Sequence, residues 1–299
     1  MKELVVISGK GGTGKTSIVA SFAVLAQNAV LADCDVDAAD LHLVLEPRII
    51  QQSDFSGGSR ARVRSADCTG CGQCVDVCRF DALGLSGPAN GDAERTAQVD
   101  PIGCEGCGVC AHVCPVDAID FKPAINGQWY LSETRCGAMV HARLGIAEEN
   151  SGKLVTLVRS EASKLAKQRG LDLVVIDGSP GVGCPVIASI TGSNVVLIVS
   201  EPTLSGWHDL RRVADLTHHF GIETLVAINK WDLNEDLAKQ MEAQARERGL
   251  KVVGRVRYDV AVTHAQVARK SVVEHASNGA ASDIRQLWDA VAGVLQSCD

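Results

Sequence analysis

The chain has 299 residues and a formal net charge of −7 at pH 7. This acidic balance and an aromatic content of only 4% argue against a broad nucleic-acid-binding face. The sequence contains no apolar run near the ~20 residues that span a bilayer and no signal-peptide pattern after Met1, so we expect a cytoplasmic protein. In that compartment, the twelve cysteines are expected to bind metals or carry redox chemistry rather than form disulfides.

Short β-branched runs alternate with helix-length segments along most of the chain. These runs are residues 4–7, 30–32, 173–176, 195–199, 225–228 and 252–256. Such a rhythm predicts an α/β fold with a mostly parallel sheet that is covered by helices on both faces. Apolar side chains at helical spacing between Leu154 and Ala166 predict a helix that leads into the strand ending at Asp177.

The segment GKGGTGKT, residues 9–16, follows the first run and precedes a predicted helix. It fits the G-x4-G-K-[ST] pattern, in which glycines let backbone amides converge on phosphate oxygens. We expect Lys15 to reach the β- and γ-phosphates of a nucleotide and the Thr16 hydroxyl to bind Mg²⁺. The predicted nucleotide and magnesium ligands of this loop are Gly9, Gly11, Gly12, Thr13, Gly14, Lys15, Thr16 and Ser17.

Carboxylates follow two of the predicted strands, at the sheet edge where open α/β sheets bind ligands. Asp35 is a candidate to orient the attacking water or to support Mg²⁺, with Asp33 behind it. Solvated loop carboxylates are the alternative for this pair. Asp177 directly follows four apolar residues and is predicted to be the Walker B carboxylate near the magnesium.

The segment VAINKWD, residues 226–232, ends a further predicted strand with Asn229, Lys230 and Asp232. This order resembles the N-K-x-D base-recognition motif. A plain strand-to-helix turn is the alternative for so short a pattern, but its position in the series of strand ends favours base recognition.

Eight cysteines lie in two groups with the same C-x2-C-x2-C-x3-C spacing. This is the spacing of bacterial two-cluster ferredoxins, in which the fourth cysteine of each group binds the other cluster. Structural zinc is the alternative, although zinc sites normally use cysteine pairs separated by longer loops. Arg79 replaces the proline of the ferredoxin pattern, whereas Pro115 is in place. The predicted [4Fe–4S] ligand sets are Cys68, Cys71, Cys74 and Cys114 for one cluster, and Cys104, Cys107, Cys110 and Cys78 for the other.

With Lys10, the glycine loop is similar to the deviant Walker A signature of the MinD/ParA superfamily of P-loop ATPases, which belongs to the SIMIBI class. The motifs DCD, VIDGSPG and INKWD follow in the order of that family. Together with the cysteines, the chain resembles members that carry an inserted two-cluster ferredoxin domain. The resemblance implies a MinD-like domain formed by residues 1–58 and 123–299, and an inserted α+β ferredoxin domain at residues 59–122.

The resemblance further implies binding of ATP, Mg²⁺ and two [4Fe–4S] clusters by a slow, partner-stimulated ATPase. Its catalytic residues are expected to be Lys10, Lys15, Asp35 and Asp177. The family dimerises with ATP, which predicts a homodimer or a heterodimer with a paralogue. Lys10 then reaches the phosphates of the partner subunit, where a cation supplied in trans stabilises the transferring phosphoryl group.

Two outputs of such a dimer stay open: electron transfer to a redox partner, or assembly of a metal or iron–sulfur cluster on a client protein. Cys136 and Cys184 are candidates for a thiol site that holds a metal or a transferable cluster, with small core residues as the alternative. A third hypothesis is a ParA- or MinD-like positioning or scaffold protein without redox turnover, which predicts association with DNA or membrane.

The predicted C-terminal helix bears on that third hypothesis. It has an apolar stripe but only one basic residue, Arg285. Binding to an anionic membrane needs several basic residues on the polar face, so we expect no stable membrane anchoring and instead packing on the ATPase core. The stripe consists of Ile284, Leu287, Trp288, Val291 and Leu295.

Overall fold

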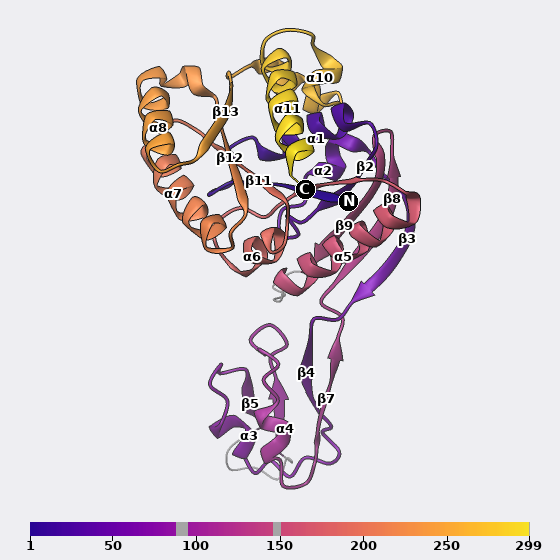
Figure 1. Cartoon of the computed structure of the whole chain (residues 1–299). Helices are drawn as coiled ribbons and strands as arrows, with labels where there is room; N and C mark the ends of the chain where they lie inside the picture. The colour runs from indigo at the N-terminus through magenta and orange to yellow at the C-terminus, as the bar shows by residue number, and fades with distance from the viewer. Residues whose placement is uncertain (88–94, 146–150, 299) are drawn as a thin grey trace. The chain divides into compact units, whose positions relative to one another are not determined.

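Nine strands form one sheet in the computed structural model, which describes residues 1–87, 95–145 and 151–298 (Figure 1). The strand order is β13-β12-β11-β1-β10-β2-β9-β8-β3, and the seven strands from β13 to β9 pair in parallel. The strands are β1 (Lys2–Ile7), β2 (Ala29–Asp33), β3 (Arg48–Phe55), β8 (Gly127–Thr134), β9 (Gly137–Leu144), β10 (Leu173–Asp177), β11 (Val195–Ser200), β12 (Glu223–Asn229) and β13 (Lys251–Val256).

The chain divides into two compact units. The sheet unit comprises Met1–Ser53, Trp129–Arg143 and Ser151–Asp299, and the insert comprises Asp54–Gln128 and Leu144–Asn150. The insertion predicted at residues 59–122 lies inside the longer range of the insert.

Helices cover both faces of the sheet (Figure 1). In β1, Leu4 and Val6 face a core that includes residues of α1 and α11, while the alternating residues Val5 and Ile7 are fully buried as well. Burial on both faces explains why the parallel strands are nearly continuous apolar runs. The helices of the sheet unit are α1 (Lys15–Ala26), α2 (Leu41–Leu45), α5 (Ser151–Arg169), α6 (Cys184–Ile190), α7 (Leu204–His219), α8 (Glu235–Glu247), α9 (Val260–Val267), α10 (Val272–His275), α11 (Ala280–Ser297) and the 3₁₀ turn η1 (Trp231–Leu233).

The predicted helix between Leu154 and Ala166 is confirmed as α5. The C-terminal helix α11 buries Ile284, Leu287 and Val291 in the core, which confirms that its apolar stripe packs within the sheet unit. None of the described helices is both long and apolar enough to cross a membrane.

The insert is built from two similar halves. It contains β4 (Gly58–Val63) paired antiparallel with β7 (Ile119–Ala124), β5 (Leu83–Ser86) paired antiparallel with β6 (Thr96–Val99), and the helices α3 (Gln73–Asp76) and α4 (Val109–Val113). Gly72 and Gly108 precede the two helices with φ of 82° and 75°, a conformation that favours glycine. Asp81 and Asp117 share a φ of 51° after the two cysteine groups. The repeated conformation reflects the sequence repeat of CRFDAL and CPVDAI.

Candidate nucleotide site and cysteine cavities

The glycine loop connects β1 to α1 and lies beside a cavity of about 420 Å³, a volume typical of small-molecule sites. Gly14 stands immediately before α1 with φ of 88°. Its left-handed conformation favours glycine and leaves space for the side chain of Asn229, which a β-carbon would obstruct. The cavity is also lined by Tyr258 and Gln266, which come from the segment after β13 and from α9.

Lys15, in the first turn of α1, lies between the carboxylates of Asp35 and Asp177. Its Nζ atom is 2.5 Å from Asp177 Oδ1 and 3.3 Å from Asp35 Oδ2, and Lys15 is only 5% exposed. Asp33 lies deeper and accepts hydrogen bonds from the backbone N–H groups of Asp35 and Leu41. Asp33 therefore shapes the loop that carries Asp35, while Asp35 and Asp177 share the lysine.

The electrostatics of this cluster are unbalanced, because three buried carboxylates surround one lysine. Burial disfavours the Lys15 ammonium, but the charges of Asp177 and Asp35 outweigh it and raise the pKa of Lys15. Burial raises the pKa of Asp33 well above its usual range, and the neighbouring charge of Asp177 acts in the same direction. The pKa of Asp35 is raised by burial, against the opposing charge of Lys15. An additional cation at this site would relieve the excess of negative charge.

Two buried polar atoms beside the loop lack a hydrogen-bond partner among the described residues: Thr13 Oγ1 and Asp177 Oδ2. Thr13 is 2% exposed and Asp177 is fully buried. Buried polar atoms without a partner are costly, so their presence beside a cavity indicates a ligand. Carboxylate and hydroxyl oxygens together with phosphates are the ligands that Mg²⁺ uses in nucleotide sites, so these residues fit a magnesium–nucleotide complex.

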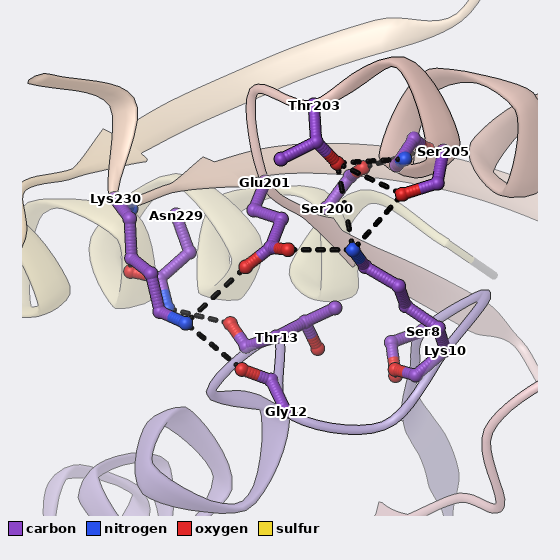
Figure 2. A network of polar contacts seen from close by, with 11 residues as sticks. Ser8, Lys10, Gly12, Thr13, Ser200, Glu201, Thr203, Ser205, Asn229 and Lys230 are labelled. Atoms are coloured by element: carbon purple, nitrogen blue, oxygen red, sulfur yellow. Dashed lines mark hydrogen bonds and ion pairs between the residues drawn. The ribbon is translucent and has the colours of Figure 1, made fainter. Parts of the chain in front are cut away.

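Lys10 belongs to the glycine loop itself, and Lys230 approaches that loop from the end of β12 (Figure 2). Lys10 Nζ is 2.6 Å from Glu201 Oε1, and Lys230 Nζ contacts both Gly12 O at 2.9 Å and Glu201 Oε2 at 3.2 Å. Asn229 donates from Nδ2 to Thr13 O at 2.7 Å. Asn229 and Lys230 therefore hold the backbone of the glycine loop.

Asp232 is exposed, and its Oδ1 accepts a hydrogen bond of 2.7 Å from the backbone N–H of Tyr258. Asp232 therefore fixes a segment that lines the cavity.

Glu201 was not predicted from the sequence. The available signal was its position directly after β11, because Asp177 likewise stands at the end of β10.

Two small cavities in the insert are each lined by four cysteines. One cavity is lined by Cys68, Cys71, Cys74 and Cys114, and the other by Cys78, Cys104, Cys107 and Cys110. The backbone N–H of Ala118 donates to Cys114 Sγ at 3.2 Å, and that of Ala97 donates to Cys68 Sγ at 3.4 Å. Hydrogen bonds to sulfur are among the interactions that tune iron–sulfur clusters.

The structure therefore brings the cysteines together in the same two sets of four that the sequence indicates. In the described part of the chain, no three His, Cys, Asp or Glu side chains converge closely enough to hold a single metal ion. A four-iron cluster has a different requirement, since it is held by four cysteines at separate corners. Four thiols around each cavity fit that requirement.

The remaining cysteines lie on separate elements of the sheet unit. Cys136 is half-buried against the core between β8 and β9, and burial raises the pKa of its thiol. Cys184 is exposed and begins α6 beside Gly152 of α5. Cys34 is fully buried between Asp33 and Asp35, and burial strongly raises its pKa. Cys136 and Cys184 are both free cysteines.

Comparisons with known proteins found similarities for the cysteine-rich insert and for the overall fold. The family model "4Fe-4S dicluster domain" matches residues 50–118. The fold is similar to the septum site-determining protein MinD from Pyrococcus horikoshii, solved as a complex with Mg-ADP (TM-score 0.58, 16% identity, covering 98% of each chain). It is also similar to a ParA family ATPase from Chlorobium tepidum (TM-score 0.52, 15% identity, covering 97% of this chain and 98% of that one).

The fold and the cysteine-rich insert define a class: MinD/ParA-like P-loop ATPase folds with an inserted 4Fe-4S dicluster domain. The resemblance and the fold class predicted from the sequence are thereby confirmed. Uncharacterized protein MJ0578 from Methanocaldococcus jannaschii is 36% identical over 236 residues, covering 78% of this chain and 79% of the relative. The chain belongs to the same family as MJ0578.

Proposed function

We propose that the protein binds and hydrolyses MgATP and that ATP-dependent dimerisation is coupled to two [4Fe–4S] clusters in the insert. The observation that carries the nucleotide part is the contact of Lys15 with Asp35 and Asp177 beside a cavity of about 420 Å³. The two cavities lined by cysteines support the proposal that the insert binds two [4Fe–4S] clusters.

ATP changes the charge balance at Lys15. Because phosphate oxygens carry more negative charge than one carboxylate, Lys15 leaves Asp177 and Asp35 for the β- and γ-phosphates. The two carboxylates then become available, Asp177 for the magnesium shell and Asp35 for the attacking water. Magnesium supplies positive charge that stabilises the developing charge of the phosphoryl group. Thr16, which lines the cavity at the start of α1, is placed to add its hydroxyl to the magnesium shell.

The nucleobase is assigned to the part of the cavity beyond Asn229 and Lys230. Both residues hold the glycine loop through backbone carbonyls, and Asp232 holds Tyr258 through its backbone N–H. Their role in this proposal is to fix the walls of the base site. The P. horikoshii MinD structure is described as a complex with Mg-ADP, which favours adenine as the base.

The insert is assigned two [4Fe–4S] clusters that accept and release single electrons when bound. The cysteine thiolates hold them, and the N–H groups of Ala97 and Ala118 donate to two sulfurs of the same set. The chain passes from Asp35 through α2 and β3 into the insert, so only these two elements separate a residue proposed to respond to nucleotide from the insert. This continuity supports coupling between nucleotide state and clusters.

A redox partner or a metallo-client protein is the expected recipient of the coupled step. To test coupling, the EPR spectrum of the reduced protein is recorded with and without MgATP. We expect MgATP to change the cluster signals. Identical spectra, together with cluster oxidation by an acceptor at a nucleotide-independent rate, would refute coupling to electron transfer.

Cluster assembly on a client is tested separately. Protein carrying labelled iron is incubated with an apo-protein acceptor in the presence and absence of MgATP. Label that stays with this chain under both conditions rules out cluster donation. A protein that dimerises with ATP, yet shows neither response, would support the positioning or scaffold hypothesis instead.

A further inference from the structure

One carboxylate contacts two lysines of the nucleotide site. Glu201 follows β11 and is placed between Lys10 and Lys230, with Oε1 toward the former and Oε2 toward the latter (Figure 2). Its side chain is 17% exposed. Burial opposes ionisation of this carboxyl, but the hydrogen bonds from Lys10 and Lys230 outweigh it and lower the pKa of Glu201. The carboxylate is therefore charged whenever both lysines are in place.

The ammonium of Lys10 is fully occupied within its own chain. A lysine ammonium has three N–H donors. Lys10 Nζ contacts Glu201 at 2.6 Å, Ser205 Oγ at 3.1 Å and Thr203 Oγ1 at 3.4 Å. Thr203 caps the N-terminus of α7 by accepting a hydrogen bond from Gly206 N. Because Thr203 and Ser205 belong to the start of α7, two of these three oxygens come from the N-terminus of one helix.

Glu201 also connects Lys10 to the opposite side of the loop. Lys230, its second partner, donates to Gly12 O at 2.9 Å. The path from Lys10 through Glu201 and Lys230 to Gly12 therefore ties the glycine loop to the turn between β11 and α7. Movement of Lys10 away from Glu201 leaves the carboxylate with one cation instead of two.

We propose that Glu201 is a positioning residue that retains Lys10 in its own subunit until the phosphates of a second chain compete for it. The inference rests on the proposed function, because a nucleotide-loaded dimer is the source of those phosphates. A triphosphate attracts the ammonium more strongly than a single carboxylate, so Lys10 moves only when a loaded partner is in position. Glu201 thereby opposes pairing of chains that lack nucleotide.

The first test measures retention in the free chain. Lys10 is acylated with a limiting amount of an amine-reactive reagent without nucleotide, and its labelling rate is followed by mass spectrometry. A lysine held by three oxygens is hindered from attacking the reagent. Glu201→Gln removes the charged partner of Lys10. Because an ion pair that is not fully buried contributes up to ~1 kcal/mol, we expect Lys10 of this variant to be labelled about fivefold faster than in the wild-type protein.

Two further variants make this test specific. Ser205→Ala removes a partner of Lys10 that makes no contact with Lys230 among the described residues, and it should speed labelling by a smaller factor. Glu223→Gln is the matched control, because Glu223 pairs with Lys251 in an ion pair of 2.5 Å at the start of β12. The control should leave Lys10 labelling unchanged. Equal labelling of Lys10 in the wild-type protein and in Glu201→Gln would overturn the proposal.

The second test measures release. Dimerisation with MgATP is followed by analytical ultracentrifugation over a range of protein concentrations. Glu201→Gln should dimerise at about fivefold lower concentration than the wild-type protein. Weaker dimerisation of this variant, with faster Lys10 labelling, would show that Glu201 assists the closed dimer and would overturn the proposal that it opposes pairing until phosphates compete for Lys10. If the wild-type protein stays monomeric with MgATP while labelling still depends on Glu201, the dimer proposal and the release step fail and only the contact within one chain stands.

Discussion

Lys15 Nζ lies 2.5 Å from Asp177 Oδ1, although the two residues belong to α1 and β10. Both residues are buried, and the second carboxylate oxygen of Asp177 has no partner among the described residues. The pairing joins the lysine that we propose to bind phosphate to the carboxylate that we expect to bind magnesium. Under the proposed function, nucleotide binding exchanges this ion pair for two new ones, Lys15 with phosphate and Asp177 with the magnesium shell.

Replacement of Lys15 tests this exchange. Lys15→Met keeps an unbranched side chain, one atom shorter, but removes the cation that is proposed to meet the β- and γ-phosphates. Since removal of one transition-state donor typically costs 10²–10³ in rate, we expect ATP hydrolysis to fall by about a factor of 100 or more. Phosphate release is the measurement. Lys239→Ala, an exposed lysine of α8, is the control and should hydrolyse ATP at the wild-type rate; equal loss in both variants would contradict a specific role for Lys15.

The same substitution tests how the apo site is stabilised. Lys15→Met leaves Asp177 and Asp35 buried without their counter-ion, and such a loss costs ~3 kcal/mol in the free energy of unfolding. The double variant Lys15→Met/Asp177→Asn removes one of the unpaired charges and should recover part of this loss. Urea unfolding without nucleotide measures both. A double variant as unstable as the sum of its single variants would argue against direct coupling of Lys15 and Asp177.

A buried histidine predicts how stability depends on pH. His141 of β9 contacts Ser132 Oγ through Nε2 at 2.9 Å, and burial lowers its pKa from 6.5 to about 4. Because the folded-state pKa lies below the unfolded value, the contribution of His141 is fully present above pH 6.5 and is lost as pH falls toward 4. Lowering the pH from about 7.5 to about 5.5 should therefore cost ~1 kcal/mol of stability through this residue.

His141→Gln isolates that effect, because glutamine keeps a polar partner for Ser132 but does not titrate. The variant should lose ~1 kcal/mol less than the wild-type protein between the two pH values. Urea unfolding followed by tryptophan fluorescence is suited to the measurement. All four tryptophans, Trp129, Trp207, Trp231 and Trp288, belong to the sheet unit that contains His141. Parallel pH dependence of the two proteins would remove His141 from the explanation.

Features formed by short, continuous segments of the chain could be predicted from the sequence more fully than contacts between distant residues. The phosphate loop and the cysteine groups are short segments whose spacing is set by the ligand, so the residues could be named before the fold was known. Asp33, Asp35 and Asp177 were predictable because parallel strands present their carboxyl ends at one edge. Each of these inferences needed only the order of residues and strands.

The contact of Lys10 with Glu201 could not be predicted in this way. The two residues are distant in the sequence, and Lys10 reaches Glu201 because the start of α7 places Thr203 and Ser205 beside the loop. Asp232 illustrates the same point: its base contact stays a prediction, and the hydrogen bond that its Oδ1 accepts from Tyr258 N could not be read from the motif. Side-chain partners of this kind depend on tertiary packing, for which the sequence contains no local signal.

The two cysteine cavities predict an exchange of cluster ligands between the repeats. Cys78 follows Cys74 in the chain but lines the cavity of Cys104, Cys107 and Cys110, and Cys114 lines the other. Cys78→Ser and Cys110→Ser should therefore alter the same cluster, and Cys114→Ser the other one. Anaerobic reconstitution should give about eight iron atoms per chain for the wild-type protein, and about four for a variant that loses one cluster.

EPR spectra of the reduced variants distinguish the two assignments. Under the exchanged assignment, Cys78→Ser matches Cys110→Ser in its residual signal and differs from Cys114→Ser. Cys298→Ser, at the C-terminal end of α11, is the control and should keep the full iron content. If Cys114→Ser matches Cys110→Ser and Cys78→Ser differs from both, each group of four consecutive cysteines binds its own cluster and the exchanged assignment is wrong.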